Sequence, residues 1–167
     1  MIEFFTPKGP YGWMSNFYKA MFTLEDVEWL TVEHFFQSSK ATTPEARQRI
    51  ADAAGPGLAK KLGRACKCRD DWETVVGTEH LHNLFRDEQG IVVELVKDHY
   101  MFSALTAKFT QRHDLREALR STGDQQIIEA SPRDYYWGIG SERTGQNKLG
   151  RMLQLVRKGL PDAELGV

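Results

Sequence analysis

The sequence predicts a mainly α-helical fold with a small antiparallel β-sheet, an α+β arrangement. Two observations support this prediction. Apolar residues recur at helical spacing through most of the longer segments, whereas short, alternating, aromatic-rich segments lie near the N-terminus. No linker of low complexity and no internal repeat divides the chain. We therefore expect a single domain over residues 1–167.

The N-terminal part of the chain contains three candidate strands. They are the segments IEFF, NFYKAMF and VEWL, at residues 2–5, 16–22 and 27–30. Each is rich in the aromatic and β-branched residues that favour strands. Glu25 and Asp26 supply a turn between the last two segments. We expect these segments to form the antiparallel sheet.

Four helices are expected next. Thr31 caps a helix that runs to about Ala41, because Val32, Phe35, Phe36 and Ser39 follow at i, i+3, i+4 and i+7. The segment TPEARQRIADAAG, residues 43–55, has threonine as cap, proline at the first helical position and glycine past the end. GLAKKLGRAC, residues 57–66, forms a further short helix, and Asp71 caps one that begins at Trp72.

The second half of the chain predicts three more helices and one strand. Apolar residues mark a long amphipathic helix over residues 91–110. In DLREALRSTG, Asp114 and Glu117 have capping-box spacing and Gly123 is a stop signal. IIEAS, residues 127–131, is a candidate strand. The terminal helix, capped by Asn147, carries an apolar face of Leu149, Met152, Leu153, Val156 and Leu160.

The composition limits the classes of function. A formal net charge of −1 gives no general attraction to nucleic acid or to an anionic membrane. No apolar run is long enough for a membrane span, and MIEFFTPKGP lacks the pattern of a signal peptide, so we expect a cytoplasmic protein. Cys66 and Cys68 have no second Cys or His pair at zinc spacing, which favours two reduced thiols. No metal or cofactor is expected.

The helix after Thr31 carries the first candidate functional residues. Glu33, Gln37 and Lys40 follow at i, i+4 and i+7 and share one face. Glu33 and Lys40 lie about 10 Å apart along the axis, a span that fits a sugar phosphate held between them. The alternative is that Glu33 only complements the helix N-terminus and that Lys40 is solvated.

The segment SPRDYYWGIGSERTGQNKLG, residues 131–150, carries the second group. Its glycines match neither the dinucleotide fingerprint nor the P-loop. Asp134, Trp137 and a backbone made flexible by Gly138 remain, leading to Asn147 at a helix start, where free N–H groups favour an anion. The alternative makes Trp137 a core ring and Asp134 a turn residue.

Other candidates have a stronger structural explanation. His34 and His99 sit in apolar surroundings, where a lone histidine is more often a hydrogen-bonded core residue than a ligand. Lys108 and Phe109 could offer charge and stacking to a ligand. Phe109, however, continues the apolar face of the long helix, which favours core packing.

Five sequence blocks resemble the NADAR, or YbiA-like, family. They are SNFY at residues 15–18, VEHFFQSSK at 32–40, KF at 108–109, STG at 121–123 and D..WG.G....G.N.LG..L...R at 134–157. The last block is the most specific. This chain departs from the family pattern in GTEHLHNLFRDEQG, residues 77–90, an apparent insertion, and in Glu25–Asp26, where a glycine turn is common.

The resemblance implies hydrolysis of an N-glycosidic bond between a ribose phosphate, or an ADP-ribose, and a base. Glu33 and Asp134 would then be the carboxylates that stabilise the oxocarbenium-like transition state or activate water. Lys40 would neutralise phosphate or attack the opened sugar as a Schiff-base amine. The resemblance also implies a set of substrate-binding residues, which would stack on the base or hold ribose and phosphate: Asn16, Phe17, Phe36, Lys108, Trp137, Gly138 and Asn147.

Three functions follow from these implications. The first is release of ribose 5-phosphate from aminouracil or aminopyrimidine intermediates of riboflavin biosynthesis. The second is removal of ADP-ribose from a nucleobase, in which case nucleic acid is a partner only as the ADP-ribosylated substrate. The third is non-catalytic binding of NAD or ADP-ribose, which the joint presence of Glu33, Lys40 and Asp134 disfavours. The near-neutral charge favours a small-molecule substrate.

Overall fold

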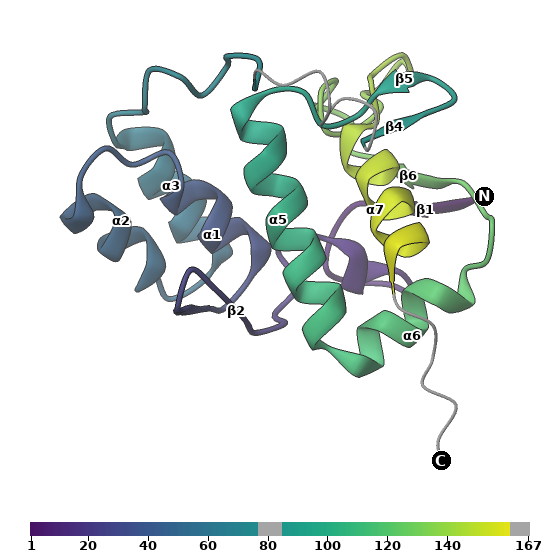
Figure 1. Ribbon diagram of the computed structural model, residues 1–167, viewed down its shortest axis with the longest axis horizontal. Helices are drawn as coiled ribbons and strands as arrows, with labels where there is room; N and C mark the ends of the chain where they lie inside the picture. The colour runs from purple at the N-terminus through teal and green to yellow at the C-terminus, as the bar shows by residue number, and fades with distance from the viewer. Residues whose placement is uncertain (77–84, 161–167) are drawn as a thin grey trace.

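Two groups of helices form the body of the molecule in the computed structural model, which describes residues 1–76 and 85–160 (Figure 1). α1, α2 and α3 pack together on one side, α5 contacts both α6 and α7 on the other, and α1 joins the groups by packing on α5. Their bounds are Val32–Ser38, Pro44–Ala51, Pro56–Ala65, Val96–Gln111, His113–Ser121 and Lys148–Gly159. The predicted mixture of α-helices and small sheets is confirmed.

Short strands pair at three places. β2 (Phe22–Leu24) and β3 (Val27–Trp29) are antiparallel, and Glu25 and Asp26 make the predicted turn with φ of 55° and 58°. β4 (Arg86–Asp87) and β5 (Gly90–Ile91) form a second antiparallel pair.

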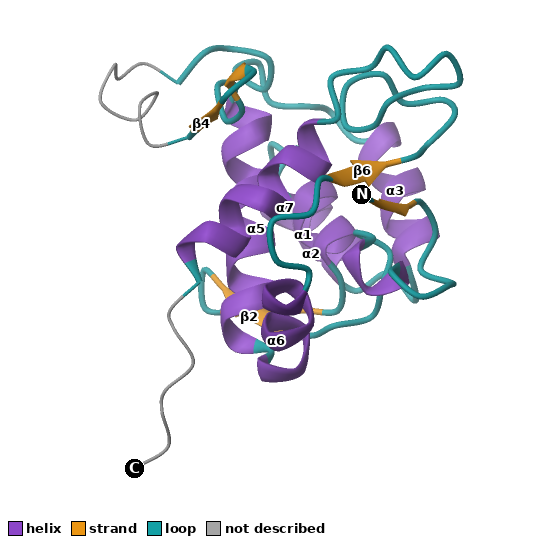
Figure 2. Ribbon diagram, turned by 90° about the vertical axis from the view of Figure 1, so that its right-hand side faces the viewer, coloured by secondary structure: helices purple, strands orange, loops and turns teal. Residues whose placement is uncertain are grey.

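The first strand does not join β2 and β3 as predicted. β1 (Ile2–Phe4) instead pairs in parallel with β6 (Ile127–Glu129), beside α7 (Figure 2). The physical reason is that alternation identifies the buried face of a strand but not its neighbour. Ile2 and Phe4 are buried, and all three residues of their partner strand β6 are buried as well.

α1 begins as the sequence predicts. Thr31 Oγ1 accepts a hydrogen bond from the backbone N–H of His34, which is the expected N-cap contact. Every residue of α1 is buried because α3, α2 and α5 surround it. The helix ends at Ser38, so Lys40 follows the helix instead of lying within it.

α2 and α3 are both confirmed. Thr43 Oγ1 accepts from the N–H of Ala46, and Pro44 occupies the first helical turn. Gly55, predicted as the stop of α2, lies at the N-cap position of α3.

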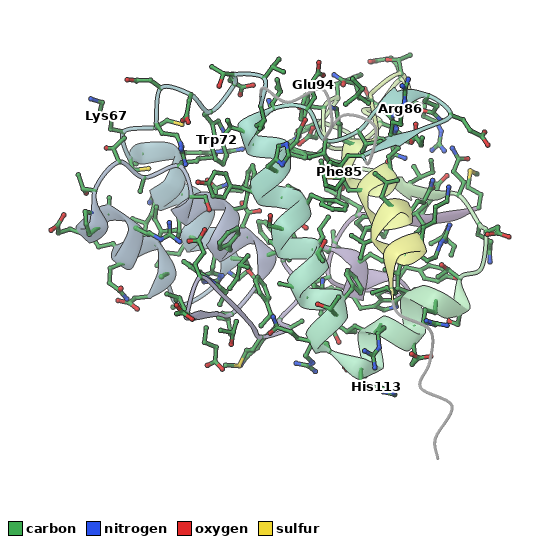
Figure 3. The ribbon with its side chains drawn as sticks, viewed as in Figure 1. Lys67, Trp72, Phe85, Arg86, Glu94 and His113 are labelled. Carbon is green, nitrogen blue, oxygen red and sulfur yellow. The ribbon has the colours of Figure 1, made fainter. Side chains whose placement is uncertain are left out.

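The helix predicted to begin at Trp72 is absent from residues 70–76, which form turns and a single bridge between Val75 and Leu95. The Asp71 carboxylate does not cap a helix because the Arg69 guanidinium holds it, at 2.5 and 2.8 Å. The Trp72 ring is buried beside α5, while Phe85 lies on the other side of this helix (Figure 3).

The long helix begins later than predicted. Residues 90 and 91 belong to β5, Gly90 has φ of 112°, and α5 starts at Val96. Val92 and Val93 are buried in the irregular segment between them, so their apolar character reflects burial and not helical periodicity. Asp98 fixes the start of α5 by accepting from the N–H groups of Glu94 and Leu95.

The predicted capping box of α6 does not form. The helix starts at His113, before Asp114, and the Asp114 carboxylate instead pairs with the side chain of Arg112 at 3.3 Å. Gly123, with φ of 56°, follows the helix as predicted.

The core is continuous between the helix groups. Rings and aliphatic side chains from α1, α5 and α7 share it with β1, β2 and β6. Within residues 1–76 and 85–160, no helix is long and apolar enough to cross a membrane.

Candidate active site

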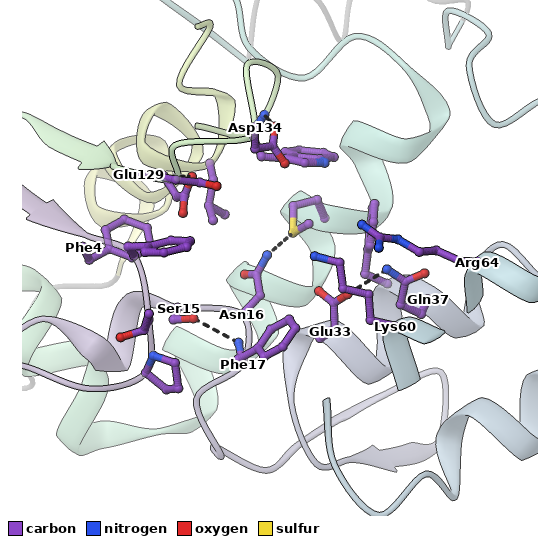
Figure 4. A pocket seen from close by; sticks show the side chains of 18 of the residues that line it. Phe4, Ser15, Asn16, Phe17, Glu33, Gln37, Lys60, Arg64, Glu129 and Asp134 are labelled. Carbon is purple, nitrogen blue, oxygen red and sulfur yellow. Dashed lines mark hydrogen bonds between the residues drawn. The ribbon is translucent and has the colours of Figure 1, made fainter. Parts of the chain in front are cut away.

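A cavity of about 430 Å³ lies where α1, α3, α5, the β1–β6 pair and the loop after β6 meet (Figure 4). Seven of the predicted site residues line it: Asn16, Phe17, Glu33, Phe36, Lys40, Asp134 and Trp137. They come from three separate sequence blocks. The fold therefore brings most of the candidate residues together.

Glu33 is a buried carboxylate on the α1 wall. Its side chain is 5% exposed, and Oε1 accepts a hydrogen bond of 2.7 Å from Gln37 Nε2. The backbone N–H of Glu33 donates to the carbonyl of Asn16, which ties the two motifs together. Burial raises the pKa of Glu33, and the Gln37 hydrogen bond and the nearby cations Lys60, Lys40 and Arg64 oppose that rise. Glu33 thus faces positive charge.

Lys40 lies just past α1, against aromatic rings. Its Nζ is 5.3 Å from the ring centroid of Phe36 and 5.9 Å from that of Trp72. Burial lowers the pKa of Lys40, while Glu33 acts in the opposite direction. The surroundings suit either of its two predicted roles, as a phosphate contact or as an amine nucleophile.

The rings of Phe36 and Trp137 form the aromatic wall of the cavity, and further rings pack behind them. Phe36 meets Trp137 edge-on at 5.5 Å and Trp72 at 5.2 Å, and Trp72 stacks on Tyr100 at 5.7 Å. Trp137 is half-buried and packs on the core as well as lining the cavity. Trp137 therefore belongs both to the core and to the cavity lining.

Asp134 is both a turn residue and a residue of the cavity lining. Its Oδ1 accepts from the N–H groups of Tyr136 and Trp137, at 2.9 and 2.7 Å, which makes it the turn residue of the alternative interpretation. The same side chain borders the cavity. This turn sets the direction of the Trp137 ring.

Glu129 is a cavity residue that the sequence interpretation missed. It ends β6 and is 6% exposed, and Oε2 accepts from the N–H of Ser131 at 3.2 Å. Burial raises the pKa of Glu129 to about 7, and the charge of Asp134 acts in the same direction. A glutamate inside the apolar segment IIEAS was the available signal, because an unpaired charge is rarely buried without a function.

Two cations of α3 were missed as well. Lys60 and Arg64 lie one turn apart and border the cavity. α3 approaches α1 closely because Gly63 has no side chain: a Cβ there would come within 2.3 Å of Gln37 Oε1. The segment GLAKKLGRAC predicted only a short helix, since its cations are typical of any solvated face.

Asn16 and Phe17 form the floor of the cavity. The Asn16 amide nitrogen contacts the sulfur of Met101 at 3.4 Å, and its Oδ1 is buried with no partner in the described part of the chain. Lys60 Nζ lies 5.5 Å from the Phe17 ring centroid. A substrate hydroxyl or amino group would give Asn16 Oδ1 a partner.

Three predicted binding residues lie outside the cavity lining. Lys108 is fully buried, and its Nζ donates to the carbonyls of Trp13 and Ser15. Asn147 is at the N-cap position of α7 but makes no capping hydrogen bond. Its Oδ1 instead accepts from the backbone N–H of Glu129, and its Nδ2 donates to the carbonyl of Ile127.

Gly138 is the third, and its role is in packing. A Cβ at this position would come within 2.1 Å of Glu129 Oε2. In this structure Lys108, Asn147 and Gly138 each pack against or hold a neighbouring part of the site, without lining the cavity.

The other polar candidates also have structural positions. His34 is buried, with Nδ1 2.8 Å from Thr31 Oγ1 and Nε2 3.0 Å from the Ala53 carbonyl, as expected of a core histidine. His99 packs edge-on against Phe85. Cys66 and Cys68 are free thiols. Across residues 1–76 and 85–160, no group of three or more His, Cys, Asp or Glu is arranged to hold a metal.

Comparisons with known proteins extend over nearly the whole chain. The family model for the NADAR domain matches residues 3–161. An N-glycosidase of Nostoc punctiforme is 34% identical over 94% of this chain and 90% of its own length. N-glycosidase YbiA of Escherichia coli is 30% identical over 96% of this chain and 88% of its own length.

Further comparisons concern structure and pathway. The NMR structure of Escherichia coli YbiA matches with a TM-score of 0.76 at 30% identity, covering 95% of this chain and 83% of that one. A riboflavin biosynthesis protein of Vibrio vulnificus is 28% identical over 96% of this chain, which corresponds to 39% of that protein. The resemblance seen in the five sequence blocks is confirmed, and this chain belongs to the NADAR domain family.

Proposed function

We propose that this protein is an N-glycosidase that hydrolyses aminouracil or aminopyrimidine ribose 5-phosphates and releases the base and ribose 5-phosphate. The observation that carries the proposal is one cavity in which the buried carboxylate of Glu33 lies among cations and opposite carboxylates, beside an aromatic wall. The N-glycosidase names of two relatives support the reaction class. The name of the Vibrio vulnificus relative supports the pathway.

The walls of the cavity match the three parts of such a substrate. Trp137 and Phe36 offer rings on which a planar base would stack. Lys40, Lys60 and Arg64 supply the positive charge that a phosphate needs, although the whole chain is nearly neutral. The ribose would lie between these two regions, with its anomeric carbon near Glu33.

Glu33 would act on the sugar. Breaking the bond to the base develops positive charge at the anomeric carbon, and an ionised Glu33 would stabilise that charge or take a proton from the attacking water. The neighbouring cations favour the ionised form, and Gln37 holds one carboxylate oxygen in place.

The remaining predicted residues would support this geometry. Lys40 would bind the phosphate or, in the alternative mechanism, attack the opened sugar as a neutral amine. Asp134 would act chiefly by fixing Trp137, since its Oδ1 is already engaged by two backbone N–H groups. A cytoplasmic location stays a prediction from the sequence.

The test is incubation with an aminouracil ribose 5-phosphate, its dephosphorylated riboside and an ADP-ribosylated oligonucleotide, with mass spectrometry of the released base or sugar. We expect turnover of the phosphorylated riboside and a higher KM for the dephosphorylated one. Faster cleavage of the oligonucleotide would replace the proposed substrate with an ADP-ribosylated base. Binding of ligands without any release would identify a non-catalytic module.

Glu33→Gln tests the assigned residue. The substitution removes a charge at nearly constant shape, so we expect kcat to fall by about 100-fold or more while substrate affinity stays within a few-fold. Glu45→Gln is the matched control, because Glu45 is exposed on α2. An unchanged kcat in Glu33→Gln would remove this residue from the chemistry.

A further inference from the structure

Glu129 lies across the cavity from Glu33. Figure 4 shows Glu129 and Asp134 on one side of the cavity and Glu33 and Gln37 on the other. The two glutamates belong to distant elements, β6 and α1. Their side chains are 6% and 5% exposed. A substrate in the cavity would therefore have a buried carboxyl group on each side.

Three contacts fix the backbone of Glu129. Its N–H donates to Asn147 Oδ1, and its carbonyl accepts from the N–H of Ile139. The residue pairs with Phe4 in the β1–β6 ladder. Of the carboxylate, Oε2 is engaged by Ser131 N–H, whereas Oε1 has no hydrogen-bond partner in the described part of the chain. One oxygen is therefore available to a ligand from a fixed position.

The two glutamates have different electrostatic surroundings. Glu33 faces the cations Lys60, Lys40 and Arg64 and accepts a hydrogen bond from Gln37, all of which favour its charged form. Glu129 faces another carboxylate, Asp134, from the following loop, and among the facing cations only Lys60 of α3 opposes that effect within the described residues. Burial disfavours the charge on both. The hydrogen bond from Ser131 N–H favours the charged form of Glu129, but one cation does so here against three around Glu33, and this difference assigns the proton donor to Glu129 and the charged role to Glu33.

We propose that Glu129 is the catalytic acid that protonates the departing base, while Glu33 acts on the sugar and its attacking water. The inference rests on the proposed function. In the reaction, the bond between the anomeric carbon and the base nitrogen breaks and its electron pair stays on the base. That base takes the proton of Glu129. Water bonds to the anomeric carbon and loses a proton to Glu33, and exchange with solvent restores both groups.

This division of roles can be tested with the leaving group. The aminouracil base leaves as an anion unless it is protonated, whereas the pyridinium ring of nicotinamide riboside 5-phosphate leaves as a neutral molecule. We expect Glu129→Gln to lower kcat by about 100-fold or more on the aminouracil substrate. On the pyridinium substrate its kcat is expected to stay within about five-fold of wild type. Glu33→Gln, the matched variant of the opposite wall, is expected to lower both.

The pH profile provides a second readout. The pKa of Glu129 is raised to about 7, so the acid form is lost as the pH rises through that value. Turnover of the aminouracil substrate by the wild type should therefore decline above about pH 7. Turnover of the pyridinium substrate should show no such decline. The residual activity of Glu129→Gln on the aminouracil substrate should not decline above pH 7 either.

The possible outcomes separate the inference from the proposed function. If the wild type releases no base from either substrate, the proposed function is wrong. If the wild type is active but Glu129→Gln loses both activities equally, or neither, the acid role is wrong. Thermal unfolding of each variant identifies a folding defect. If a variant is destabilised, the pH profile of the wild type is the test instead. An equal loss of turnover above pH 7 on both substrates then overturns the inference.

Discussion

At the scale of single residues, the loop after β6 is shaped by a missing side chain. The Cα of Gly138 packs directly against Glu129, because a Cβ would come within 2.1 Å of Oε2 and 2.8 Å of the Glu129 carbonyl oxygen. Gly138 therefore allows a carboxylate to remain buried at the cavity wall. The glycine pattern that first suggested ligand binding serves packing at this position.

Gly138→Ala should consequently damage both stability and turnover. The backbone contact cannot be relieved by a side-chain rotation, so we expect a loss of about 1–3 kcal/mol in the free energy of unfolding. Turnover should fall because Glu129 is displaced. Urea denaturation and kcat measure the two effects. Gly57→Ala on α3 is the control, since its Cβ would meet nothing within 4 Å. Equal stability of the two variants would contradict the packing argument.

The two buried glutamates show which residues of the site can be identified from the sequence alone. Glu33 could be identified because it shares a helical face with Gln37 and Lys40. Glu129 and Lys60 carry no such spacing, because the β1 strand that pairs with Glu129 and the Phe17 ring beside Lys60 both come from distant segments. The spacing of a motif reports local neighbours. Contacts across the cavity depend on tertiary packing.

At the scale of elements, local signals predicted helices with side-chain or proline caps and misjudged those set by long-range contacts. Thr31 and Thr43 cap α1 and α2 as expected. The start of α5 instead depends on Asp98, whose carboxylate accepts from two backbone N–H groups after a buried irregular segment. Apolar residues of that segment resembled one more helical turn. These apolar residues are buried although their segment has no regular secondary structure, and the helix was therefore predicted to start too early.

α5 also carries an unusual buried cation. Lys108 Nζ is enclosed by the rings of Phe109 and Tyr18 and donates to two backbone carbonyls, and within residues 1–76 and 85–160 no carboxylate pairs with it. Burial lowers the pKa of Lys108 from 10.5 to about 7. The lysine therefore links α5 to the turn that precedes Asn16.

Lys108 should make stability depend on pH in the alkaline range. Below pH 7 both the folded and the unfolded states carry the proton. Between pH 7 and 10.5 the unfolded state binds a proton that the folded state lacks, so the free energy of unfolding rises with pH. We expect the wild type to gain up to about 1.4 kcal/mol per pH unit relative to Lys108→Met. Urea denaturation at pH 7, 8 and 9 measures this difference, and parallel curves would contradict a neutral lysine.

At the scale of the whole molecule, one buried network connects the loop of the site to two helices. Asp98 of α5 accepts from Lys148 Nζ of α7 at 3.1 Å and from the Tyr136 hydroxyl at 2.7 Å. Tyr136 directly precedes Trp137 and meets it edge-on. The position of the aromatic wall thus depends on residues outside the cavity lining.

Breaking this network should weaken the fold and the site together. Asp98→Asn leaves Lys148 as a buried charge without its partner, and we expect a loss of about 3–5 kcal/mol in the free energy of unfolding. Asp98→Asn with Lys148→Met should cost less than the sum of the single variants, because both charges are removed. A double-mutant cycle in urea measures the coupling. Strict additivity would contradict a direct interaction, and a higher KM would report displacement of Trp137.

The parallel pairing of β1 with β6 has a consequence for the timing of assembly during translation. Ile2 pairs with Ile127, so the first strand leaves the ribosome long before its partner is synthesised. Closing so long a loop is entropically costly and delays non-local contacts. The wall that holds Glu129 is completed only after that closure. A nascent chain would therefore complete this wall of the cavity only after residues 127–129 have been synthesised and have paired with residues 2–4.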